Sequence, residues 1–232
     1  MTLLNAIQSR HSVRHYISQP LSQEVVDVLQ AKIDECNRAG NLHIQLVLNE
    51  KKGFSGMMAY GSFSGVENYL VMAGVDSTSS STENHLKSLD ERIGYYGQQI
   101  VLLAEQLGLG NCWAGISYRK VKGTYELQGK EKIACMISLG YPDDPGRNMK
   151  KKSVEQLSNV SPDTPDWFRN GVEAARLAPT AINQQKFHFE YIAPNMVKAS
   201  RGFSMVGYTK MDLGIAKLHF EIGAGKENFE WV

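Results

Sequence analysis

The chain has 232 residues, and its 25 Lys and Arg side chains balance 24 Asp and Glu for a formal net charge of +1 at pH 7. So small a net charge gives no general attraction for nucleic acid or anionic lipid, which argues against both as partners. Cys36, Cys112 and Cys135 lack paired spacing, so we expect no disulfide framework or zinc site, and a reducing, cytoplasmic setting.

No membrane segment or secretion signal is expected either. The first residues are polar too early for a signal peptide, and no apolar run approaches the roughly 20 residues that span a bilayer.

Hydrophobic periodicity and capping residues predict alternating helices and strands. Apolar residues at helical spacing, bounded by Ser22 and Gly40, predict a helix over residues 23–37. Other helices are expected near residues 3–7, 83–107, 153–156, 167–177 and 212–222. Strands are expected at residues 42–48, 68–75, 132–141 and 187–191, with an edge strand at 227–232.

Three stretches have the composition of turns or loops. Residues 49–65 hold four glycines among methionines and aromatic residues without periodicity, so we expect a mobile loop that folds over a ligand site. Residues 77–82 are expected as a serine-rich linker and residues 111–116 as a turn.

A polar bend, residues 179–185, separates a helix ended by Pro179 from the strand at 187–191. Thr180, Asn183, Gln184 and Gln185 gather donors and acceptors that suit a planar ligand with polar edges. The alternative is an ordinary connection whose amides satisfy loop backbone.

The segment Arg10-His11-Ser12-Val13-Arg14 places two guanidinium groups four residues apart with a hydroxyl between them. In a helix this spacing puts both arginines on one face, where they and Ser12 suit an oxyanion such as phosphate. The alternative is a solvated basic helix end.

Five motifs together resemble the nitroreductase family of flavoenzymes. They are SRHSVRHY, LAPTAINQQKF, GLGNCWAGI after a long helix, LGYP at a strand end, and the basic KKKS. The late position of LAPTAINQQKF, with DLGIAKLHF after it, resembles the rearranged branch often labelled putative TM nitroreductases. Gln185-Lys186-Phe187 stands where the usual motif has Pro-Trp after the glutamine.

The resemblance implies FMN as cofactor. The residues that it implies at the phosphate are Arg10 and Ser12, with His11 nearby and help from Lys150 or Lys152. It also implies Arg14 at the pyrimidine edge of the flavin, where a cation stabilises the reduced, anionic ring.

On the ring side, the resemblance implies contacts from both the polar bend and the turn at 111–116. The residues that it implies there are Pro179, Thr180, Asn183 and Gln184 along the ring and ribityl chain, and the backbone near Ala114 and Gly115 at flavin N5. His188 and His219 are expected as core or surface residues. We assign no catalytic side chain and no metal ligand.

The fold expected is α+β: a mixed, largely antiparallel sheet flanked by helices, with FMN in a cleft between two related halves. Residues 1–232 are expected to form one domain, its halves being 1–150 and 167–232, because residues 25–48 and 172–192 repeat a helix, a bend and a strand. We favour a site built within one chain, a single-chain pseudo-dimer. A homodimer with shared sites stays open.

The implied activity is FMN-dependent reduction. NAD(P)H passes hydride to the flavin and leaves before a nitroaromatic, quinone or similar acceptor enters, which is a ping-pong mechanism. One alternative is a protein that binds or stores FMN without turnover, and another is a scaffold without flavin.

Overall fold

The computed structural model describes residues 1–55, 63–76, 85–143, 146 and 149–232, and its elements fall into two groups along the chain. The first group is α1 (Leu3–Ser9), α2 (Gln23–Gly40), β1 (Gln45–Val47), β2 (Asn68–Gly74), α3 (Leu89–Gln106), β3 (Gly110–Ala114) and β4 (Lys132–Gly140). The second is α4 (Val154–Leu157), α5 (Asp166–Ala175), β5 (Phe187–Ile192), β6 (Met196–Arg201), α6 (Thr209–Ala224) and β7 (Glu230–Trp231), with short 3-10 helices at Ala181–Asn183 and Lys226–Asn228.

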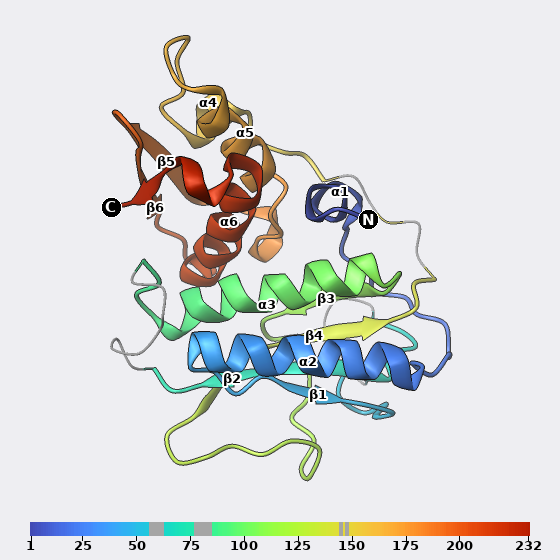
Figure 1. The fold of residues 1–232 in the computed structure, drawn as a ribbon. Helices are drawn as coiled ribbons and strands as arrows, with labels where there is room; N and C mark the ends of the chain where they lie inside the picture. Colours follow the sequence, from blue (N-terminus) through green and yellow to red (C-terminus); the bar gives the residue numbers. More distant parts are fainter. Residues whose placement is uncertain (56–62, 77–84, 144–145, 147–148) are drawn as a thin grey trace.

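The strands form two sheets. The first has the order β1-β2-β4-β3 with antiparallel neighbours throughout, and the second has the order β5-β6-β7, in which β6 and β7 are parallel. The predicted α+β class with largely antiparallel strands is confirmed. Figure 1 shows α2 and α3 lying over one face of the first sheet, with the second sheet and α6 on the far side of α3.

The central strand β2 is buried along its whole length because both faces of the first sheet are covered. Leu70 and Met72 belong to the core beneath α2 and α3, whereas Tyr69 and Val71 pack on the opposite face with Phe54. This alternation follows from the two-residue period of a strand. The sequence shows only a continuous apolar run, as expected for a strand with two buried faces.

Serine residues set the starts of three helices. Ser22 Oγ accepts a hydrogen bond from Val25 N–H at 3.3 Å, and Ser153 forms the predicted capping box with Gln156. The predicted start of the long helix at residue 83 is wrong, because α3 begins at Leu89 after its N-cap Ser88. Leu86 continues the apolar spacing but precedes the cap.

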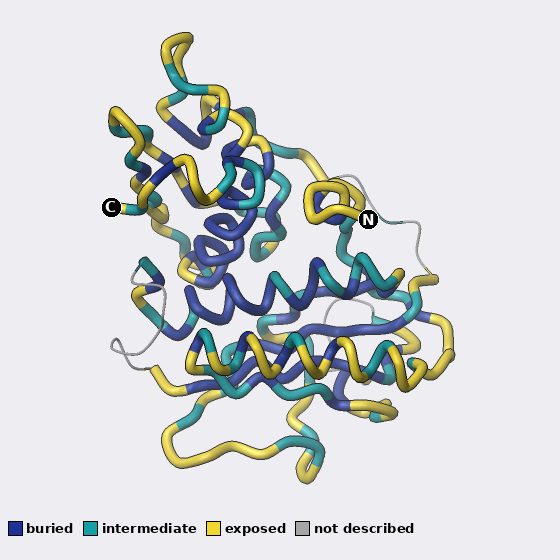
Figure 2. The backbone as a smooth tube through the Cα atoms, viewed as in Figure 1, coloured by how far each residue is buried: buried dark blue, intermediate teal, exposed yellow. Residues whose placement is uncertain are grey.

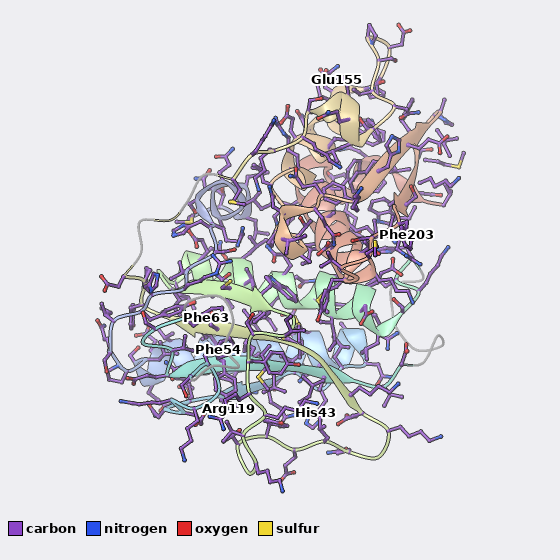
Figure 3. All side chains as sticks on the ribbon, turned by 180° about the vertical axis from the view of Figure 1, so that it is seen from behind. His43, Phe54, Phe63, Arg119, Glu155 and Phe203 are labelled. Carbon is purple, nitrogen blue, oxygen red and sulfur yellow. The ribbon has the colours of Figure 1, made fainter. Side chains whose placement is uncertain are left out.

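Two other predictions of local structure need comment. Residues 111–116 are not a turn: Asn111 to Ala114 belong to β3, whose backbone pairs with β4. The described ends of the loop at 49–65 pack against the first sheet, where the Phe54 ring lies 5.0 Å from that of Phe63 (Figure 3). Residues 56–62 of this loop, and the serine-rich stretch 77–82, lie outside the described residues.

α3 and α6 cross through two glycines. A methyl group on Gly94 would collide with the backbone oxygen of Met211, and one on Gly214 would collide with the backbone oxygen of Glu91. Gly94 and Gly214 are each the sixth residue of their helix, so the crossing is reciprocal. Figure 2 shows that α6 is buried along most of its length.

The two groups of elements share an order. Helix, helix, strand, strand, helix and strand occur as α1-α2-β1-β2-α3-β3 and again as α4-α5-β5-β6-α6-β7. β4 is added to the first group, where it lies between β2 and β3. Within the described residues, no helix combines the length and apolar character needed to cross a membrane.

Candidate functional site

The segment that holds Arg10, Ser12 and Arg14 is extended, not helical. α1 ends at Ser9, and Ser12 forms a parallel bridge with Asn111 of β3. Val13 donates its N–H to Asn111 O at 2.9 Å and is buried. Since side chains alternate along extended backbone, Arg10, Ser12 and Arg14 lie on the side opposite Val13. Arg10, Ser12 and Arg14 are therefore on one side because side chains alternate along an extended backbone, and not because the segment is helical.

These three side chains share one neighbour, the thiol of Cys112. Burial raises the pKa of Cys112, and the charge of Arg14, a hydrogen bond with Ser12 and the charge of Arg10 all oppose that rise. The structure therefore brings Arg10, Ser12 and Arg14 together. His11 lies apart from them, with its ring beside Gly146 and its Nδ1 3.4 Å from Ser9 O.

Arg10 has a buried and incompletely bonded guanidinium group. Its Nε and Nη1 atoms have no hydrogen-bond partner among the described residues, and burial lowers its pKa. Asn111, whose side chain is also buried, has neither amide atom paired within the described chain. Buried polar atoms without partners are costly, so both side chains are candidates to bind a ligand. The sequence pattern did not single out Asn111.

The three lysines of the basic segment 150–152 have different surroundings. The Lys152 ammonium donates to Gln185 O at 2.7 Å, and Lys150 is exposed. Lys151, which was not predicted, is the lysine whose pKa the charge of Arg10 affects. Burial lowers the pKa of Lys151, and the charges of Arg10 and Arg176 lower it further.

The polar bend is held in an unusual backbone conformation. Ile182, Asn183 and Gln185 have φ values of 47°, 58° and 46°, in the left-handed region that costs free energy for residues other than glycine. Asn183 Nδ2 donates to Lys150 O at 2.8 Å, and Gln185 N donates to Thr180 Oγ1 at 3.1 Å. Segment 150–152 therefore supports the bend through backbone carbonyl groups.

Asp212, near the start of α6, anchors the same bend. Its carboxylate accepts hydrogen bonds from Ala181 N at 3.0 Å and from Gln184 Nε2 at 2.7 Å. Burial raises the pKa of Asp212 to about 6, although these two hydrogen bonds oppose the rise. Gln184 also donates to Gly207 O, which leaves its buried Oε1 without a partner among the described residues.

Ala114 and Gly115 mark the end of β3, where the chain meets Tyr208. A side chain at Gly115 would collide with the Tyr208 ring, so only glycine fits beneath that ring. Tyr208 has φ 60° and precedes α6. The predicted contact region at 114–115 thus lies next to the second group of elements.

A line of buried hydrogen bonds links β3 to α5. Trp113 Nε1 donates to Gln98 Oε1 at 3.1 Å, and Gln98 Nε2 lies 2.9 Å from His219 Nε2. His219 Nδ1 lies 3.1 Å from Ala174 O, so the neutral tautomer protonated at Nδ1 satisfies every atom. Burial, and next the charge of Arg10, lower the pKa of His219 to about 3. His219 is a core residue, as expected, and it ties the two halves together.

Taken together, the fold and these contacts define an α+β protein in which segments 10–14, 111–115 and 179–185 are positioned by packing between two groups of elements. A family model described as "Putative TM nitroreductase" matches residues 2–224. The chain belongs to this nitroreductase family, which makes it an oxidoreductase by family.

Comparison with solved structures shows the same fold. A structure described as a putative nitroreductase from Thermotoga maritima has a TM-score of 0.63 and 22% identity, with 98% of this chain and 85% of that chain covered. A structure described as a putative nitroreductase in complex with FMN, from Desulfovibrio desulfuricans, has a TM-score of 0.53 and 18% identity, with 71% of this chain and 99% of that chain covered. A nitroreductase family protein from Clostridium difficile has a TM-score of 0.52 and 18% identity, with 71% of this chain and 100% of that chain covered. No curated protein matched the chain.

Proposed function

We propose that the protein is an FMN-dependent oxidoreductase whose flavin site is built within one chain. The observation that carries this proposal is the buried guanidinium group of Arg10, near Ser12 and Arg14, whose Nε and Nη1 atoms have no hydrogen-bond partner in the described part of the chain. A phosphate group would accept those hydrogen bonds and offset the cost of burying the charge.

The residues present fit FMN at both of its ends. Arg10 and Ser12 would bind the phosphate, with help from Lys150 or Lys152 as the resemblance implies, and Lys151 would add positive charge near Arg10. Gln184 Oε1, which accepts no hydrogen bond from the residues that the structure describes, is an acceptor suited to an N–H group at the edge of a flavin ring. The hydrogen-bond donors of Arg10 and Ser12 match the anionic phosphate of FMN. The acceptor of Gln184 matches the N–H group of the flavin ring.

The remaining assignments keep the roles that the resemblance implies. Arg14 would place positive charge at the pyrimidine edge of the ring, where it would stabilise the reduced form. Pro179, Thr180 and Asn183 would line the ring and ribityl chain. Ala114 and Gly115 would present backbone N–H groups to N5. None of these roles requires a side-chain acid or base.

When bound, FMN would supply two-electron chemistry, taking hydride from NAD(P)H and delivering it to a nitroaromatic, quinone or similar acceptor in turn. The task of this chain would be to hold the ring with one face open to both partners. Its three unpaired, buried cysteines suit a reducing, cytoplasmic setting.

An absorbance spectrum of the purified protein, taken before and after refolding with FMN, tests cofactor binding. We expect the yellow spectrum of a bound flavin. Anaerobic mixing with NADH or NADPH then tests turnover: bleaching, followed by recovery when an acceptor is added, supports the enzyme. A flavin that only dithionite reduces would instead indicate storage, and a protein that binds no flavin would refute the proposal.

A further inference from the structure

The lining of a pocket of about 440 Å³ contains none of the predicted site residues. The pocket is bounded by the residues that precede α3, by the end of β6, by one face of α6 and by the chain end beyond β7. Figure 1 shows the start of α3, β6 and the C-terminus on the same side of the molecule. The volume falls within the roughly 300–1,000 Å³ that small-molecule sites occupy.

The lining carries an excess of positive charge. Lys87, Arg201 and Lys210 line the pocket, and no ion pair joins any of them to a carboxylate among the described residues. Lys217 also lines it, but its ammonium is 3.0 Å from Glu91 and is thereby neutralised. Three cationic side chains therefore converge on one cavity, where Glu91 is the one acidic side chain among the described residues of the lining.

The carboxylates near these cations do not cancel them. Glu91 is engaged by the Lys217 ammonium and by the backbone N–H of Lys87 at 3.1 Å. Asp90 interacts with the charge of Lys210, but it does not line the pocket, and burial raises its pKa. An anion in the pocket would thus meet positive potential.

One wall of the pocket is aromatic. The rings of His85 and Trp231 are stacked with centroids 5.4 Å apart, and both residues line the cavity. Ala199 and Leu213 add apolar surface. Burial lowers the pKa of His85 to about 3, so this ring is neutral at physiological pH. A flat aromatic wall beside a cationic rim is suited to a ligand with a planar ring and an anionic group.

The position of the pocket follows from the shared order of the two halves. At the predicted flavin site, Tyr208 precedes α6 and packs on Gly115 at the end of β3. At the pocket, His85 precedes α3 and packs on Trp231 of β7. The pocket and the predicted flavin site thus each lie beside residues that precede one of the two crossing helices. The pocket lacks the Arg10-to-Arg14 segment, so its chemistry differs.

We propose that this pocket is a second binding site, which takes a phosphate-bearing small molecule with a planar ring, of the mononucleotide class. The phosphate would lie among Lys87, Arg201 and Lys210, and the ring would lie against Trp231. This proposal does not depend on flavin binding.

Calorimetric titration of adenosine 5′-monophosphate into protein loaded with one equivalent of FMN, and freed of excess FMN by gel filtration, tests the proposal. The bound FMN keeps the nucleotide phosphate away from Arg10, and removal of the excess leaves the pocket open. We expect saturable binding that weakens at least tenfold in Arg201→Glu and in Lys210→Glu. Both side chains are exposed, so these variants should fold. Lys122→Glu makes the same change of charge on an exposed lysine elsewhere and should bind like the parent.

Three results would overturn the proposal. The first is no saturable binding at millimolar nucleotide, and the second is equal binding to the parent and the two pocket variants. The third is equal affinity for inorganic phosphate, which would show that the ring is not recognised. Adenosine should bind at least tenfold more weakly than its monophosphate. If the protein binds no flavin, the same titration is made with the Arg10→Glu variant, in which the predicted phosphate site is disrupted. Loss of nucleotide binding in that variant, with binding retained in the two pocket variants, would place the ligand at Arg10 and reject the pocket.

Discussion

Arg10 lies at the end of α1 with its charge buried. Two of its guanidinium nitrogens lack hydrogen-bond partners among the described residues, which is unusual for an arginine whose only role is to stabilise the fold. Removal of a side chain that serves only packing lowers the stability of the empty protein. Removal of one that serves an anion lowers affinity instead. Arg10 and Asn111 both have buried side-chain atoms that lack a partner within the described residues, which indicates the second case.

Arg10→Ala should weaken FMN binding ten- to hundredfold, because a charge-assisted hydrogen bond is worth about 1.5–3 kcal/mol. Titration followed by flavin fluorescence measures the change. Arg38→Ala removes an exposed arginine from α2 and should leave affinity unaltered. A large loss of stability in flavin-free Arg10→Ala, with affinity preserved, would contradict the assignment.

Asp212 gives a prediction about pH. Its pKa is raised from 3.8 to about 6, so the folded state holds the proton more tightly than the unfolded state. Its contribution to stability is complete below pH 4 and is lost as pH rises through 6, a change of about 3 kcal/mol. Asp212→Asn should abolish this part of the pH dependence. Urea unfolding at pH 4 and pH 7 measures it.

The control for this experiment is Asp163→Asn, which changes an exposed carboxylate and should keep the parental slope. An Asp212→Asn variant whose stability varies with pH as the parent's does would show that another group is responsible.

At the scale of elements, the crossing of α3 and α6 decides how closely the halves approach. Capping serines and strand alternation are local signals, so α2, α4 and β5 could be predicted from the sequence. β3 was mistaken for a turn because Asn111 and Gly115 are common in turns, and only pairing with β4 makes that segment a strand. Glycines in a helix look unfavourable in isolation, and their purpose becomes visible only when the partner helix is in place.

Gly214→Ala should destabilise the protein. Alanine improves helix propensity by about 1 kcal/mol, but its methyl group would force the helices apart, and such overpacking costs roughly 1–3 kcal/mol or more. Thermal unfolding gives the sign. Gly202→Ala is the matched control, since its methyl group meets only ordinary contacts at 3.7 Å or more. Equal stability of Gly214→Ala and the parent would mean that the crossing adjusts freely.

For the whole molecule, the central question is whether each flavin site belongs to one chain. Segments 10–14 and 111–115 come from the first group of elements, and the polar bend comes from the second. The family motifs pointed to these segments from the sequence. The partners that position the bend and Gly115, namely Asp212, Lys150 and Tyr208, lie far away along the chain, so sequence spacing gives no sign of their contacts. The second pocket depends on tertiary packing for the same reason.

Two inactive variants can answer that question. We expect Arg10→Glu and Asn183→Ala, unfolded together and refolded as a mixture, to stay as inactive as each variant alone. In a homodimer with shared sites, mixed pairs would contain one intact site and activity would return. Recovery of activity would thus show that each site is shared between two chains and would reject the single-chain arrangement.

The line from Trp113 through Gln98 and His219 to Ala174 carries a further consequence. It passes from β3 to α5, and the step from Gln98 Nε2 to His219 Nε2 is the one that crosses between the halves, so any motion that separates them must break that hydrogen bond. The Gln98 amide proton in this bond should therefore exchange with deuterium only during such openings, at a rate set by their free energy. Exchange at the Gln98 side chain thus reports how often the two halves separate, and it can be measured with no ligand bound.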